Sequence, residues 1–129
     1  MQKKKNCKVF LCSRKKTYKG WDLDLNDKII SWNSRNLIKA DLLVNATPLG
    51  MIRKNVLPVS EGKLKNFKNI IDLPINYESK LKQKCKKLNI NYIAGSEFAF
   101  FQALEQFKIY SNRKKISYKL AKKLIKHSK

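Results

Sequence analysis

Polar side chains at the end of one apolar run are the best placed for chemistry. Segment 41–45 reads Asp-Leu-Leu-Val-Asn, Ala and Thr47 follow, and Pro48 and Gly50 then turn the chain. A continuous apolar run is typical of a parallel strand covered on both faces, and ligands of open α/β sheets bind at the carboxyl ends of such strands. Asn45 and Thr47 could therefore contact a cofactor or substrate, or they could only satisfy the backbone of a tight turn.

A second candidate follows an earlier apolar run, Val9–Cys12, which is predicted to be a buried strand. Ser13, Arg14 and Lys15 come directly after it. Arginine is a planar, permanently charged and bidentate donor, which suits a phosphate group. In a segment so rich in lysine, Arg14 could equally be a solvated surface cation.

The cysteines and the histidine argue against several classes of protein. Cys7, Cys12 and Cys85 form no CxxC pair and leave an odd thiol, while the one histidine, His127, has no ligand cluster around it. We expect neither a disulfide framework nor a metal site, and a reducing cytoplasm is the expected compartment. No run approaches 18 apolar residues, so no membrane span is predicted.

The net charge of +21 would ordinarily indicate a polyanionic partner such as nucleic acid. Lysine supplies 26 of the 30 cations, although arginine is the better fork for phosphates and base edges. The chain is also rich in Asn and Ile, as expected of a genome rich in A and T. This composition favours drift in base composition, rather than selection for a polyanion-binding site, as the origin of the positive charge. A small basic nucleic-acid-binding protein remains an alternative, with no specific nucleic-acid partner as the main expectation.

Strands and helices must alternate to position these residues. Further short strands are expected at 28–32, 69–73 and 91–94. Helices are expected around 81–88, over 97–110 and after Ser117, and the aromatic face of the helix over 97–110 is expected to be core. This alternation predicts an α/β fold with a mostly parallel sheet and flanking helices. We expect residues 1–110 to form one domain, and residues 111–129 to form a linker and a C-terminal amphipathic helix.

Three motifs in order resemble the shikimate dehydrogenase family. A strand ending in Asn-Ala-Thr leads into Gly50-Met51, a later strand ends in Asp72-Leu73, and a glycine precedes a helix that carries Gln102-Ala103. The resemblance covers roughly Val9–Tyr110 and implies the C-terminal, NADP-binding portion of such an enzyme. The implied reaction is the reduction of 3-dehydroshikimate to shikimate by hydride transfer, in aromatic amino-acid biosynthesis.

The resemblance also implies roles for individual residues. The cofactor side would comprise Ser13, Arg14 and Lys15 at the 2′-phosphate of NADP, Thr47 in the Asn-Ala-Thr loop, Leu73 beside the nicotinamide, and Gly95 at a close backbone approach. Gln102 would donate to a hydroxyl of a shikimate-like substrate.

The departures from the family pattern are as informative. Ile75 stands where the family has a tyrosine, and Ser-Glu-Phe follows Gly95 where the family has a Gly-x-x-Met pattern. The four glycines are far apart, so the glycine-rich phosphate loop is missing. The family's catalytic Lys–Asp pair is unmatched, so no catalytic residue is assigned and independent activity is left open.

The resemblance therefore implies a partial Rossmann-like fold without its first, central strand, as expected of a truncated or split form. In the strand order 3-2-1-4-5-6, the strands at 9–12 and 41–45 would flank an empty slot. They would pair directly, or a complementary N-terminal chain would supply the strand. A non-catalytic nucleotide-binding relative is the remaining alternative.

Overall fold

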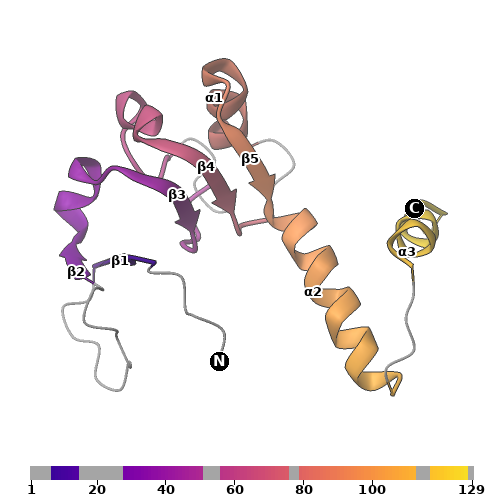
Figure 1. Ribbon diagram of the computed structural model, residues 1–129. Helices are drawn as coiled ribbons and strands as arrows, with labels where there is room; N and C mark the ends of the chain where they lie inside the picture. The colour runs from indigo at the N-terminus through magenta and orange to yellow at the C-terminus, as the bar shows by residue number, and fades with distance from the viewer. Residues whose placement is uncertain (1–6, 15–27, 51–55, 76–78, 113–116, 128–129) are drawn as a thin grey trace.

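The computed structural model describes residues 7–14, 28–50, 56–75, 79–112 and 117–127, which alternate between strands and helices (Figure 1). The strands are β1 (Phe10–Ser13), β2 (Lys28–Ser31), β3 (Ala40–Asn45), β4 (Phe67–Asp72) and β5 (Asn91–Ala94). The helices are α1 (Lys80–Leu88), α2 (Gly95–Tyr110) and α3 (Tyr118–His127), with short 3-10 helices η1 (Trp32–Leu37) and η2 (Glu61–Asn66). Lys15, one of the residues expected at the 2′-phosphate, lies outside the described residues.

All the described strand pairs are parallel, as the sequence predicts. β1 pairs with β2 in one sheet, and β3, β4 and β5 form a second sheet in that order. The expected alternative in which the strands at 9–12 and 41–45 pair directly is wrong for the described residues, because β1 and β3 belong to different sheets. In Figure 1, β1 lies between β2 and the end of β3.

The core lies under the three-stranded sheet, where η2 and α1 cover β4. Its buried apolar side chains are Val59, Leu64, Phe67, Ile70, Leu81 and Cys85. α1 forms where expected because Ser79 caps it: the Ser79 hydroxyl accepts a hydrogen bond from the Lys82 amide at 3.0 Å. Leu81 and Cys85, one turn apart, then face the core.

The aromatic face of α2 departs from expectation. α2 leaves the end of β5 and extends away from the sheet (Figure 1). On the face formed by Ala99, Phe100, Ala103, Leu104, Phe107 and Tyr110, Phe107 and Tyr110 are 40% and 87% exposed, so within the described residues this face is not core. Tyr118 of α3 packs against this helix, with its ring centroid 5.3 Å from that of Phe100 and 5.6 Å from that of Phe101.

No described helix is long and apolar enough to cross a bilayer.

Candidate functional site

The carboxyl ends of β3, β4 and β5 meet at one edge of the sheet and bring Asn45, Leu73 and Gly95 together. Asn45 is in register with Asp72, which is in register with Ala94. The Leu73 amide donates to the Asn45 carbonyl at 3.0 Å. A Cβ added to Gly95 would lie 2.2 Å from the Leu73 carbonyl oxygen, so only glycine allows this contact.

A buried hydrogen-bond network fastens the same edge. Asn45 Nδ2 donates to Asp72 Oδ1 at 2.7 Å, and the Tyr92 hydroxyl donates to Asp72 Oδ2 at 3.0 Å. Asn45 and Asp72 are 2% and 1% exposed. The Ser79 hydroxyl, at the start of α1, lies 3.3 Å from that of Tyr92. Side chains from three strands and one helix therefore hold the edge rigid.

Asn45 also holds the turn that follows it. Its Oδ1 accepts hydrogen bonds from the Thr47 hydroxyl at 2.6 Å and the Thr47 amide at 3.2 Å, and its Nδ2 donates to the Leu49 carbonyl at 3.3 Å. The Leu49 amide donates to the Thr47 hydroxyl at 3.3 Å. Both polar side chains thus satisfy the turn, which was the simpler of the two expectations, and they shape the loop at the sheet edge.

Tyr92 acts in this network as a donor. Burial, above all, raises the pKa of its phenol to about 12, and the neighbouring Asp72 carboxylate acts in the same direction. The phenol therefore keeps its proton at neutral pH. Sequence reasoning missed Tyr92 and Ser79 as site residues, because their contacts with Asp72 and with each other join segments far apart in the chain.

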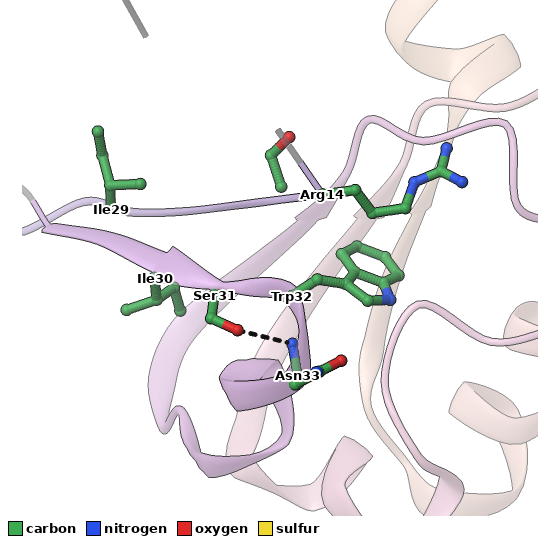
Figure 2. A pocket seen from close by; sticks show the side chains of 7 residues that line it. Arg14, Ile29, Ile30, Ser31, Trp32 and Asn33 are labelled. Carbon is green, nitrogen blue, oxygen red and sulfur yellow. Dashed lines mark hydrogen bonds between the residues drawn. The ribbon is translucent and has the colours of Figure 1, made fainter. Parts of the chain in front are cut away.

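A second candidate site lies at the carboxyl ends of β1 and β2. An open pocket of about 510 Å³ is lined by Ser13, Arg14, Ile29, Ile30, Ser31, Trp32 and Asn33. Figure 2 shows the side chains of Arg14 and Trp32 extending in the same direction from the two strand ends. Arg14 is exposed, so its guanidinium can meet a ligand in the pocket.

Arg35 fixes the position of Trp32 in this pocket. The guanidinium carbon of Arg35 lies 4.3 Å from the indole centroid. Arg35 Nη1 donates to the Trp32 carbonyl at 2.8 Å, and its Nε donates to the Pro58 carbonyl at 2.9 Å. The sequence predicted a strand through Trp32 and gave no role to its ring; the structure ends the strand at Ser31 and begins η1 there.

Gln102 projects from α2 and is exposed, as is Phe98 one turn before it. Ile75, at the family tyrosine position, is 54% exposed. Among the described residues, no group of three or more His, Cys, Asp or Glu side chains could hold a metal ion.

Parallel strands joined through helices, with polar groups gathered at their carboxyl ends, define a Rossmann-like α/β protein. No family model matches the chain. It is 32% identical over 105 residues to the shikimate dehydrogenase (NADP(+)) of Clostridium beijerinckii, covering 80% of this chain and 39% of that protein. It is 35% identical over 91 residues to that of Thermotoga maritima, covering 68% of this chain and 35% of that protein.

Solved structures agree with these relatives. Shikimate dehydrogenase 1 from Peptoclostridium difficile aligns with a TM-score of 0.72 and 26% identity, covering 89% of this chain and 43% of that chain. The Thermotoga maritima enzyme aligns with a TM-score of 0.62 and 31% identity, covering 78% and 39%. The chain is a homologue of part of the shikimate dehydrogenases and spans about two fifths of the length of the relatives it matches.

Proposed function

We propose that this chain forms the NADP-binding, C-terminal part of an oxidoreductase of the shikimate dehydrogenase type. In that reaction a hydride passes from the reduced nicotinamide to the ketone carbon of 3-dehydroshikimate, and a proton passes to the ketone oxygen. The observation that carries the proposal is the shared edge of Asn45, Leu73 and Gly95 in a chain related to NADP(+)-named dehydrogenases.

The pocket at β1 and β2 suits the adenosine end of the cofactor. Arg14 offers a bidentate, charged donor to the 2′-phosphate, and Ser13 lies beside it at the pocket wall. The indole of Trp32, braced by Arg35, offers a flat face on which an adenine ring can stack. Ser13 and Arg14 therefore fit the roles implied by the resemblance.

The carboxyl ends of β3, β4 and β5 could contact the nicotinamide end of the cofactor, but with fewer specific groups than the pocket at β1 and β2 offers to the adenosine end. Leu73 is half-buried at the edge and offers an apolar contact. Gly95 is already required by the Leu73 carbonyl, so its lack of a side chain has a structural cause of its own. Thr47 shapes the 45–50 loop through its bonds to Asn45 and Leu49 and would contact the cofactor mainly through that loop.

Two other parts of such a site, a glycine-rich loop and a proton donor for the ketone oxygen, are not identified in these 129 residues. The four glycines lie far apart, so no glycine-rich loop provides amide donors for a pyrophosphate. We propose that Gln102 donates to a substrate hydroxyl from α2, and we assign no proton donor for the ketone oxygen within this chain.

The adenosine subsite is tested by titrating the 129-residue chain with 2′,5′-ADP and with 5′-AMP, following the fluorescence of the indoles. We expect weak binding of 2′,5′-ADP, tighter than that of 5′-AMP. Arg14→Ala should weaken 2′,5′-ADP by about tenfold or more and leave 5′-AMP nearly unchanged, since a hydrogen bond to a charged group contributes about 1.5–3 kcal/mol. The matched control Lys86→Ala removes one exposed cation from α1 and should change neither. Equal effects of the two variants would contradict the assignment.

Activity is tested by shikimate-dependent formation of NADPH, followed by absorbance. The 129-residue chain alone should show none above background, because a single phosphate contact does not offset the cost of ordering a dinucleotide. With an added polypeptide that carries the glycine-rich loop and the Lys–Asp pair, Gln102→Ala should raise KM for shikimate more than KM for NADP. Robust turnover by the chain alone would overturn this account.

A further inference from the structure

Arg35 of η1 lies against the indole of Trp32 and is held by three contacts. Its guanidinium carbon is 4.3 Å from the indole centroid, its Nη1 donates to the Trp32 carbonyl at 2.8 Å, and its Nε donates to the Pro58 carbonyl at 2.9 Å. Two backbone acceptors and one ring together fix the plane of the guanidinium. Arg35 therefore constrains the side chain of Trp32 as well as its backbone.

The bond to Pro58 ties this arrangement to the core under the three-stranded sheet. Pro58 is buried and adjoins Val59, which is 3% exposed in that core. A neighbouring bond joins the same two segments, since the Ser60 amide donates to Asn36 Oδ1 at 2.8 Å. Of these two links between η1 and the segment at 58–60, the one made by Arg35 belongs to the residue that contacts the indole.

The indole has two faces, and Arg35 lies over one of them. Trp32 lines the pocket together with Arg14, and it is half-buried, so part of its surface is open to a ligand. Figure 2 shows both side chains extending in the same direction from the ends of β2 and β1. A flat ring of a ligand can therefore stack on the indole while an anionic group of the same ligand meets Arg14.

The contact with Arg35 also matters for the strength of stacking. A ligand that stacks on a mobile side chain must order that side chain, which weakens binding. With Arg35 in place, the indole is already ordered in the free protein. A purine has a larger flat surface than a pyrimidine, so it gains more from an indole that does not move.

We propose that Arg35 is a positioning residue that sets the base selectivity of the pocket at β1 and β2: by fixing the Trp32 indole, it makes the pocket prefer purine to pyrimidine nucleotides. This inference rests on the proposed nucleotide binding and deepens it, because it assigns the choice of base to a residue that acts through another. Arg14 recognises phosphate, whereas Trp32 and Arg35 together recognise the base.

Arg35 is poorly placed to be a second phosphate ligand. Arg14 is exposed, whereas Arg35 is half-buried and uses two of its nitrogens to bind backbone carbonyls. Turning its guanidinium toward a phosphate would break both bonds and uncover the indole. A phosphate ligand would set the preference for 2′,5′-ADP over 5′-AMP, whereas a positioning residue would set the preference for 5′-AMP over 5′-UMP.

The test titrates the 129-residue chain with 5′-AMP, 5′-UMP and 2′,5′-ADP, followed by NMR so that variants without the indole can be measured. The parent should bind 5′-AMP about fivefold or more tightly than 5′-UMP, and Arg35→Gln should bring the two affinities within about twofold of each other. The ratio of 2′,5′-ADP to 5′-AMP affinity should stay unchanged. The matched control Asn36→Ala breaks the neighbouring bond to Ser60 and should keep the base preference of the parent.

Two further measurements separate positioning from a general loosening of the fold. With Trp32→Ala already present, Arg35→Gln should have no additional effect on either nucleotide, because the two residues act together. In a Trp21→Phe background, Trp32 is the one remaining indole. Its fluorescence anisotropy without nucleotide should decay faster in Arg35→Gln than in the parent or in Asn36→Ala.

Arg35→Lys provides the comparison if Arg35→Gln does not fold. It keeps the positive charge but lacks the planar fork that binds two carbonyls, so its base preference should lie between those of the parent and Trp32→Ala.

Four outcomes would each overturn the inference: equal losses for 5′-AMP and 5′-UMP, a changed ratio of 2′,5′-ADP to 5′-AMP, an additive effect in the Trp32→Ala background, or the same effect from Asn36→Ala. If 2′,5′-ADP still binds in a manner that depends on Arg14, the proposed function stands without the inference. Absence of all nucleotide binding would overturn both.

Discussion

Asn45 and Asp72, the last residues of two adjacent parallel strands, are joined by a side-chain hydrogen bond of 2.7 Å. Both are almost fully buried, so the bond is shielded from water. Because Asn45 also binds Thr47 and Leu49, any shift of Asp72 passes directly to the loop at the sheet edge. The position of that loop therefore depends on the core beneath it.

Replacing Asn45 with alanine should lower the free energy of unfolding by about 2–3 kcal/mol, because it leaves a buried oxygen of Asp72 without its donor. Asn91→Ala is the matched control, since Asn91 makes an exposed 2.9 Å bond to Asn69; it should cost about 0.5 kcal/mol or less. Urea denaturation followed by circular dichroism measures both. Similar losses for the two variants would argue against a buried network.

Gly95→Ala should destabilise the chain by about 2 kcal/mol or more, because the new methyl group would lie 2.2 Å from the Leu73 carbonyl oxygen. Gly62→Ala, where a Cβ meets nothing within 4 Å, should be neutral or slightly stabilising. Thermal denaturation of the two variants side by side gives the comparison. A Gly95→Ala protein as stable as the parent would contradict the close approach of β4 and α2.

Tyr92 should make stability fall at alkaline pH. Its pKa is about 12 in the folded protein and 10.0 ordinarily, so between these values the folded state holds a proton that the unfolded chain releases. Stability from this group is complete below pH 10 and is lost as the pH rises toward 12. Tyr92→Phe should reduce stability at pH 8 by an amount that shrinks above pH 10. Parallel pH profiles for parent and variant would disprove this.

DNA binding should be weak and independent of sequence. The charge of +21 attracts a polyanion through counterion release, but lysines dominate and provide no fork for base edges. Fluorescence anisotropy with two unrelated duplexes should give equal affinities that disappear at moderate salt. Nanomolar, sequence-selective binding at physiological salt would instead support the nucleic-acid alternative.

The sequence was sufficient to predict the parallel strands and the edge they form. Continuous apolar runs and the Ser79 cap act locally, so β3, β4 and α1 could be placed within one or two residues. The 3-10 helices η1 and η2 were missed because so short a helix shows little periodicity.

Contacts between distant segments could not be predicted. Arg35 bonds to Pro58, and Tyr92 bonds to Asp72, across 23 and 20 residues of chain, and no local pattern encodes either pairing. The aromatic face of α2 was expected to be core because its spacing is that of a buried helix. Within the described residues Tyr118 of α3 packs against Phe100, while Phe107 and Tyr110 stay exposed. The spacing therefore showed that the face can be buried, but it could not show which element would bury it.

Among the residues that the structure describes, β1 and β3 each have one edge without a strand partner, and this feature bears on solubility. An unpaired apolar edge is a template for edge-to-edge aggregation, and lysine is a common defence against it. Molecules that each carry +21 repel one another over a Debye length of about 10 Å at 0.1 M salt and about 3 Å at 1 M. The positive charge should therefore keep molecules with such strand edges apart at low salt. At high salt, where the repulsion is screened, we expect the protein to precipitate.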